Sequence, residues 1–306
     1  MQDIGTQYPK DDLSDPSGFL SKARYYQSNY RAETLDLPFD EFGNYLMQED
    51  GEKGHNFYND LGIFDAVKYY RKYNKQLYSN MLRSEHIPFN FFIPFRHDLN
   101  FCKSVFNEIM GGCIKSIDSY ALIDNKENLK IEFAPRPIKD YLKDRTSFDT
   151  YIEYTHNDGA KGILGIEVKY TERGYHISGK HEEYAIEKED SPYHTTTKQC
   201  GLYKPEAIEK LKADEFRQIW RNQLLGEKII LNKPNEFKHF TSLTFFPKGN
   251  SHFIKASEKY IEMLQNNQNH FIPVKYEDFF TYLTKHSPDC RYSKWIDYLK
   301  ERYIVK

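Results

Sequence analysis

The chain of 306 residues is 39% hydrophobic and 16% aromatic, and 43 Lys and Arg nearly balance 45 Asp and Glu, for a formal net charge of −2. This composition predicts one large or two small folded domains and excludes general disorder. No apolar run reaches the ~18 residues that span a membrane, and no signal peptide is apparent, so we expect a cytoplasmic protein without a membrane partner. The four cysteines form no CxxC pair and predict neither a zinc site nor a disulfide framework.

Residues 1–80 are expected to form an irregular, partly helical N-terminal extension. At its end, the apolar spacing of residues 60–82 predicts one helix, capped by Asp60. The cations of this helix follow the spacing i, i+3, i+4 and i+7 and would share one face; they are Lys68, Arg71, Lys72 and Lys75. Such a basic stripe indicates a phosphate-contacting surface or, more commonly, a solvated helix face.

From residue 98 onward, helical and strand patterns alternate. The predicted segments are a helix at 98–110, strands at 129–133, 147–154 and 162–170, a loop-rich stretch at 173–213, a helix at 214–231, a strand at 239–247, a helix at 254–266, a strand at 271–275 and a helix at 295–303. The sequence Asn157-Asp158-Gly159 is a hairpin signal, and we interpret the loop-rich stretch as a lid or a substrate-contacting insert. This order predicts an α/β fold with a mixed sheet.

Three charged residues mark the predicted hairpin. Asp149 lies near the start of its first strand, and Glu167 and Lys169 lie at the end of its second. Because residues i and i+2 of a strand point to the same face, Glu167 and Lys169 project side by side, and Asp149 lies roughly opposite them across the hairpin. Buried charges are costly unless they are paired or bind a metal. The three residues therefore predict a divalent metal site beside a lysine.

The stretches Phe148-Asp149-Thr150-Tyr151-Ile152-Glu153-Tyr154 and Gly165-Ile166-Glu167-Val168-Lys169-Tyr170-Thr171-Glu172 resemble the PD-(D/E)xK nuclease superfamily, and within it a restriction-endonuclease-like branch of bacterial proteins. Asp149, Glu167 and Lys169 match its acidic residue and its (D/E)-x-K motif, although Phe148 stands where the nominal motif has proline. The segment 218–225 is similar to the helix that follows the motif in that branch. The resemblance covers residues 80–285.

The resemblance implies that residues 81–306 form a restriction-endonuclease-like core, a mixed central β-sheet flanked by helices. It also implies a metal-dependent nuclease, most typically a DNA endonuclease of restriction type. Asp149, Glu167 and the carbonyl of Val168 would bind Mg²⁺, with Mn²⁺ as an alternative ion, and Lys169 would position or help deprotonate the attacking water.

Superfamily members often place a glutamate from an early helix near the metal. Glu85 is our preferred candidate, Glu108 is the second, and the third option is that neither reaches the metal. Glu153 and Glu172 are further candidates, the first as an extra ligand and the second as a partner that orients Lys169. For each of these four glutamates an ordinary surface carboxylate is the more common situation.

Other residues are candidates for contact with nucleic acid, for which double-stranded DNA is expected and RNA is left open. Gln218 and Arg221 lie off the apolar stripe of the 214–231 helix, where they would reach the phosphate backbone or form an ion-paired helix surface. The basic stripe adds Lys68, Arg71 and Lys72. A homodimer would suit the cleavage of two strands, but no residue decides it.

Two rival interpretations remain open at this point. One is a catalytically inactive nucleic-acid-binding module on the same fold. The other is an unrelated α/β protein in which the short motif forms a surface salt bridge.

Overall fold

The computed structural model describes residues 2–7, 18–118, 129–174, 177, 183, 186–267 and 269–306. The first helices are α1 (Phe19–Asn29), α2 (Gln48–Glu52), α3 (Ile63–Tyr70), α4 (Lys75–Tyr78), α5 (Ile87–Phe92) and α6 (Leu99–Met110). The strands are β1 (Ile114–Ile117), β2 (Leu129–Phe133), β3 (Phe148–His156), β4 (Lys161–Val168), β5 (His239–Phe246) and β6 (Phe271–Lys275). The later helices are α8 (Pro192–Cys200), α9 (Ile208–Leu211), α10 (Asp214–Asn232), α11 (Ser251–Glu262), α12 (Tyr276–His286) and α13 (Cys290–Tyr303).

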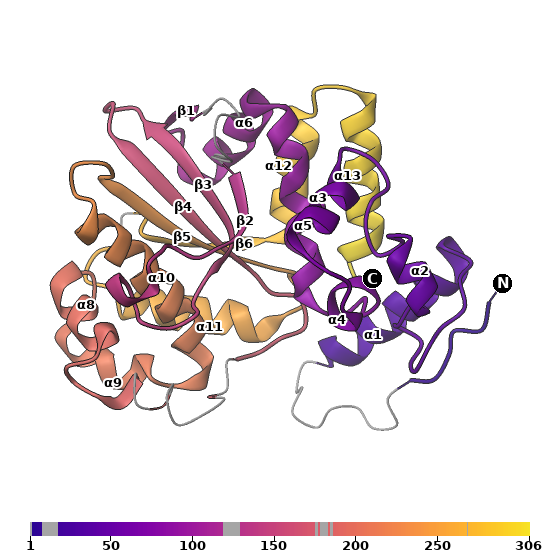
Figure 1. Cartoon of the computed structure of the whole chain (residues 1–306), viewed down its shortest axis with the longest axis horizontal. Helices are drawn as coiled ribbons and strands as arrows, with labels where there is room; N and C mark the ends of the chain where they lie inside the picture. The colour runs from indigo at the N-terminus through magenta and orange to yellow at the C-terminus, as the bar shows by residue number, and fades with distance from the viewer. Residues whose placement is uncertain are drawn as a thin grey trace.

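A mixed sheet of six strands forms the centre of the fold (Figure 1). Strands β3 and β4 form an antiparallel hairpin, whereas β4, β5 and β6 run parallel to one another. Both β1 and β2 pair with β3 on its other side, so β3 lies between the hairpin partner and two short strands. The parallel pairs are joined through helices, as parallel pairing requires. The expected mixed sheet flanked by helices is confirmed.

The hairpin fixes the register of its two strands. Gly159 adopts a φ of 88°, in the left-handed region that favours glycine, and its N–H donates to the carbonyl of His156 at 2.9 Å. Thr150 lies opposite Ile166 in the antiparallel pair. The next residue pair in this register, away from the turn, joins the start of β3 to the end of β4.

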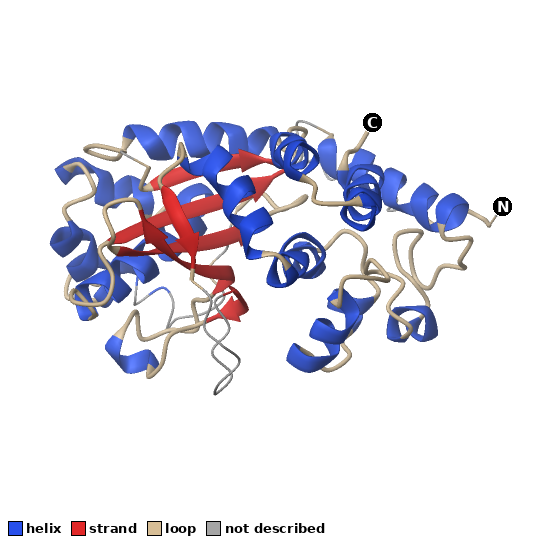
Figure 2. Ribbon diagram, turned by 90° about the horizontal axis from the view of Figure 1, so that it is seen from above, coloured by secondary structure: helices blue, strands red, loops and turns tan. Residues whose placement is uncertain are grey.

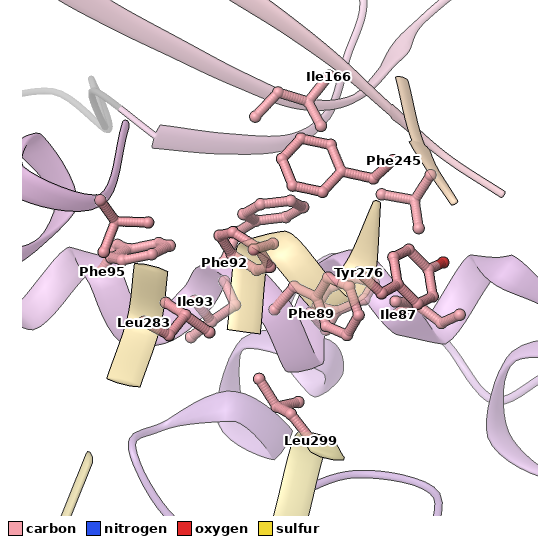
Figure 3. Close-up of a cluster of buried hydrophobic side chains, with 14 of the residues drawn as sticks. Ile87, Phe89, Phe92, Ile93, Phe95, Ile166, Phe245, Tyr276, Leu283 and Leu299 are labelled. Carbon is pink, nitrogen blue, oxygen red and sulfur yellow. The ribbon is translucent and has the colours of Figure 1, made fainter. Parts of the chain in front are cut away.

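The two faces of the sheet pack against different sets of helices. On one face, Ile166 and Phe245 contact a cluster that includes Phe92, Phe95 and Tyr276 and is built from α5, α12, α13 and their neighbours (Figure 3). On the other face a second cluster forms against α10 and α11, and Trp220 is fully buried there. Burying one such large apolar side chain contributes about 1.5–3 kcal/mol, so both helix layers hold the hairpin in place.

Helices α1, α2 and α4 lie at one side of the molecule and the sheet at the other (Figures 1 and 2). The side chain of Gln27 on α1 donates to the carbonyl of Arg302 at 2.7 Å and to the hydroxyl of Tyr170 at 2.8 Å. The first and last helices of the described chain are therefore tied to the segment that follows β4. The division into an extension (1–80) and a nuclease-like domain (81–306) stays a prediction.

Two predicted helices form with the expected ends. The side chain of Asp98 accepts a hydrogen bond from Phe101 N at 2.8 Å and so caps α6, which ends at the left-handed Gly111. Helix α10 covers Asp214–Asn232, within one residue of its predicted span.

The single helix predicted at 60–82 is wrong. Helix α3 ends at Tyr70, Arg71 is extended, and α4 begins after Asn74, whose side chain accepts from Leu77 N at 2.9 Å. This cap competes with helix continuation, because an N-cap residue needs extended backbone angles.

As a consequence, the predicted basic stripe does not exist as one helix face. Lys68 pairs with Asp65 on α3, and Arg71 pairs with Glu132 on β2. Lys72 lies exposed beyond the end of α3, and Lys75 pairs with two acidic side chains of the N-terminal segment, Asp40 and Glu41.

The sequence patterns did not predict β1, α5 or α12 of the described chain, and they gave the wrong content for one further region. Strand β1 has only four residues, too few for a clear period, and α12 follows β6 without a break. The stretch 173–213, expected to be loop-rich, contains α8 and α9. Residues 175–176, 178–182 and 184–185 of the expected lid lie outside the described residues. No helix in the described parts of the chain has both the length and the apolar character needed to cross a membrane.

Candidate active site

The start of β3 and the end of β4 bring three predicted site residues together. The Val168 N–H donates to Oδ2 of Asp149 at 2.7 Å, which holds this carboxylate against the end of β4. Nζ of Lys169 lies 2.6 Å from Oε1 of Glu167, as expected for side chains two residues apart on one strand face. The cluster lies on the sheet face that α10 covers.

Helix α10 adds a residue to this cluster that the sequence did not assign. The side-chain amide of Asn222 donates to Oε2 of Glu167 at 2.6 Å, so each oxygen of this carboxylate has its own partner. Asn222 is buried, and its Oδ1 has no hydrogen-bond partner among the described residues. The sequence signal for Asn222 was its spacing, three residues after Ile219 and four before Gly226, which places this polar side chain on the buried side of the helix.

Gly226 allows α10 to approach the sheet closely. A Cβ atom at this position would lie 2.0 Å from the ring of Phe240 on β5, which is far inside van der Waals contact. Because Asn222 lies one turn earlier on the same helix, this close approach helps bring its amide to Glu167.

Glu172 ties the cluster to the N-terminal part of the chain. Its Oε1 accepts from the backbone N and the hydroxyl of Ser84, at 3.1 and 2.7 Å, and its Oε2 accepts from Tyr170 N at 2.8 Å. Burial opposes ionisation, but nearby Lys169 and these hydrogen bonds outweigh it and lower the pKa of Glu172. Glu153, the other glutamate considered near the hairpin, accepts instead from the hydroxyl of Tyr151 at 2.9 Å.

The charges in the cluster are strongly coupled. Burial and the neighbouring Glu167 raise the pKa of Asp149 well above its usual range. Burial disfavours the charged form of Lys169, but Glu167, Glu172 and Asp149 outweigh it and raise its pKa. Two carboxylates crowded in a buried space are a natural site for a cation. Their oxygens fit the preference of a hard divalent ion such as Mg²⁺.

The structure brings neither glutamate of the early helices into this cluster. Oε1 of Glu85 accepts from Arg83 at 3.0 Å, and it is the neighbouring Ser84 that contacts the cluster. Glu108 lies on α6 and contacts two basic side chains of α12, Lys285 and His286, each at 2.7 Å.

The two polar candidates of α10 have different surroundings. Arg221 is buried, its Nε and Nη2 donate to the hydroxyl of Thr146 at 3.2 and 3.0 Å, and its Nη2 lies 3.6 Å from Asp144. Gln218 is half-buried one turn earlier on the helix. Their contact with substrate stays a prediction.

Comparison with known proteins agrees with this geometry. The sequence model of the PD-(D/E)XK nuclease superfamily matches residues 13–305, nearly the whole chain. The chain belongs to this superfamily. Comparisons with curated proteins and with solved structures found no match. Membership places the chain in a class of nucleases that use divalent metals, with nucleic acid as the substrate. The family resemblance inferred from the sequence is confirmed.

Proposed function

We propose that the chain is a Mg²⁺-dependent endonuclease that cleaves double-stranded DNA, of restriction-enzyme type, with Asp149, Glu167 and Lys169 as its catalytic residues. The observation that carries the proposal is the buried cluster at the end of the β3–β4 hairpin, in which two carboxylates and a lysine meet. A surface salt bridge has no need of the second carboxylate, whose burial costs free energy.

Asp149 and Glu167, with the carbonyl of Val168, would hold the metal. A bound Mg²⁺ polarises the phosphate and lowers the pKa of a coordinated water. Lys169 has a raised pKa and so stays protonated, which suits it to stabilise negative charge that develops on the phosphate oxygens. Asn222 fixes the orientation of Glu167 by holding the oxygen that Lys169 does not contact.

The proposal is tested by incubating the purified chain with supercoiled plasmid, linear duplex DNA, circular single-stranded DNA and RNA. Each substrate is tested with Mg²⁺, with Mn²⁺ and with EDTA. We expect the closed plasmid to be nicked and linearised only in the presence of metal. Cleavage of this substrate identifies an endonuclease, because an exonuclease has no end to attack on a closed circle. Cleavage of RNA alone would reassign the substrate. Binding of DNA without cleavage of any substrate would instead favour an inactive binding module.

The homodimer is proposed together with double-strand cleavage, since cutting two strands often takes two active sites. The dimer is tested by sedimentation of the chain with a short duplex and Ca²⁺, an ion that fills oxygen sites but supports little cleavage. We expect a complex that contains two protein copies. A complex with one copy at all protein concentrations would refute the dimer and leave the nuclease proposal standing.

A further inference from the structure

The far end of the β3–β4 hairpin carries a second cluster of ligand-type side chains. His156 ends β3, Asp158 lies in the turn, and His239 is the first residue of β5. Nδ1 of His156 lies 3.0 Å from Oδ1 of Asp158, and Nε2 of His239 lies 2.9 Å from Oδ2 of the same carboxylate. One ligand atom from each residue falls within 4.8 Å of the other two. Asp149 and Glu167 lie at the opposite end of the same two strands.

The turn that presents these atoms is held by its own hydrogen bonds. Ala160 N donates to Oδ1 of Asp158 at 2.8 Å and His156 N donates to the carbonyl of Ala160 at 2.8 Å. Asn157 N donates to the carbonyl of Cys113 at 2.9 Å, which ties the turn to the segment before β1. His239 is fixed separately by its place in the parallel β4–β5 pair. The ligand atoms thus come from a rigid frame, which lowers the entropic cost of binding an ion.

Simple ion pairing accounts poorly for this arrangement. The two imidazole rings are stacked with centroids 4.2 Å apart, and the carboxylate of Asp158 places one oxygen near a nitrogen of each ring. Two protonated rings this close would repel each other, and the single negative charge of Asp158 balances only one of them. A divalent ion bound to two neutral imidazoles and one carboxylate has no such conflict.

The donor set also selects the type of ion. Two imidazole nitrogens and one carboxylate oxygen suit Zn²⁺ and similar transition metals, whereas Mg²⁺ prefers oxygen ligands alone. Ligand atoms around a tetrahedral Zn²⁺ are roughly 3.3 Å apart, given bond lengths of about 2.0–2.1 Å. The two observed His–Asp separations, 3.0 and 2.9 Å, lie close to this value. The ion would also replace a long hydrogen bond of 3.2 Å from Asp158 N to Nδ1 of His156.

We infer that His156, Asp158 and His239 form a second metal site, specific for a transition ion of the Zn²⁺ type and separate from the catalytic cluster. Three protein ligands leave a further position for water. The bound ion joins the hairpin turn to the start of β5, so its main effect is to stabilise the sheet. The inference does not depend on the proposed nuclease activity.

The test measures Zn²⁺ binding to the whole chain in a large excess of Mg²⁺, which competes with Zn²⁺ for the oxygen-only cluster. Isothermal titration gives stoichiometry and affinity, and Co²⁺ absorption reports nitrogen ligation directly. We expect one Zn²⁺ per chain and a rise of several degrees in Tm. His239→Ala and Asp158→Asn should weaken binding at least ~10-fold, in line with the loss of one ligand.

The matched control is His286→Ala, because His286 also pairs with a carboxylate, Glu108 at 2.7 Å, but belongs to no three-residue cluster among the described residues. It should bind Zn²⁺ like the wild type. Absence of Zn²⁺ binding and of a Co²⁺ spectrum in the wild type would overturn the inference without any variant having to fold. Unchanged binding in a folded His239→Ala protein would overturn it as well.

Discussion

Nδ2 of Asn222 donates to Oε2 of Glu167 across 55 residues of sequence, at 2.6 Å, while Oδ1 of the same amide has no partner within the described part of the chain. The helix therefore fixes a carboxylate that belongs to the sheet. Residues that orient a metal ligand in this way commonly change metal affinity or activity by 10–100-fold when they are removed.

For Asn222→Ala we expect the Mg²⁺ concentration that gives half-maximal cleavage to rise at least ~10-fold. The rate at saturating Mg²⁺ should change less, because Glu167 remains present but is held less firmly. Cleavage rates measured over a Mg²⁺ series test this. Lys228→Ala, further along α10, serves as the control. An unchanged Mg²⁺ dependence in a folded Asn222→Ala protein would show that the amide has only a packing role.

Asp149→Asn should make the metal-free protein more stable while it abolishes Mg²⁺ binding. Burial and Glu167 raise the pKa of Asp149, which means that its charged form destabilises the fold at neutral pH. The amide removes this charge, and its oxygen can still accept from Val168 N. Thermal unfolding at neutral pH should give a higher Tm than the wild type without metal, and no further rise on adding Mg²⁺. A lower Tm without metal would contradict the electrostatic part of the account.

Glu227 gives a prediction for stability against pH. Burial raises the pKa of this carboxyl to about 7, and a hydrogen bond from Gln223 at 2.9 Å only partly offsets it. In the unfolded chain the group ionises near pH 4.5, so stability should fall as pH rises from there to about 7. The full shift corresponds to a loss of about 3 kcal/mol above that range.

Glu227→Gln should therefore stabilise the protein at pH 8 and have little effect at pH 4.5, as denaturant unfolding at the two pH values will measure. Glu215→Gln, near the start of the same helix, is the matched control and should show no such difference. Equal stability of the wild type and Glu227→Gln at pH 8 would show that the carboxyl is not desolvated.

Arg221→Ala should act mainly through the fold. Its guanidinium is buried on Thr146 and near Asp144, and removing one partner of a buried charged pair commonly costs about 3–5 kcal/mol. Urea unfolding should show a loss of about this size, whereas the half-buried Gln218→Ala should lose less than about 1 kcal/mol. Wild-type stability combined with weakened DNA binding would instead support the direct phosphate contact expected from the sequence.

The sequence was informative where local rules decide the structure. The Asp158-Gly159 turn and the two-residue period of the strands placed Asp149 near Glu167, and the apolar period of residues 98–110 predicted α6. These features depend on a few neighbouring residues, so a single sequence contains them.

Features that depend on packing between distant segments could not be read in this way. The contacts of Asn222 with Glu167 and of Ser84 with Glu172 join residues 55 and 88 positions apart. The helix predicted at 60–82 failed because the cap at Asn74 competes with an apolar period that continues past it. The cluster of His156 and His239 could not be predicted for the same reason, because only the pairing of β5 with β4 brings the ring of His239 to the β3–β4 turn.

The assignment of Lys169 to the active site is tested by comparing plasmid cleavage by the wild type, Lys169→Ala and Lys161→Ala in Mg²⁺. Lys161 is a lysine at the opposite end of β4, where it pairs with Asp118 at 2.7 Å, so it controls for loss of charge on the same strand. We expect cleavage by the wild type and Lys161→Ala, and a loss of at least ~100-fold in Lys169→Ala. Wild-type cleavage by a folded Lys169→Ala protein would contradict the assignment of this cluster as the active site.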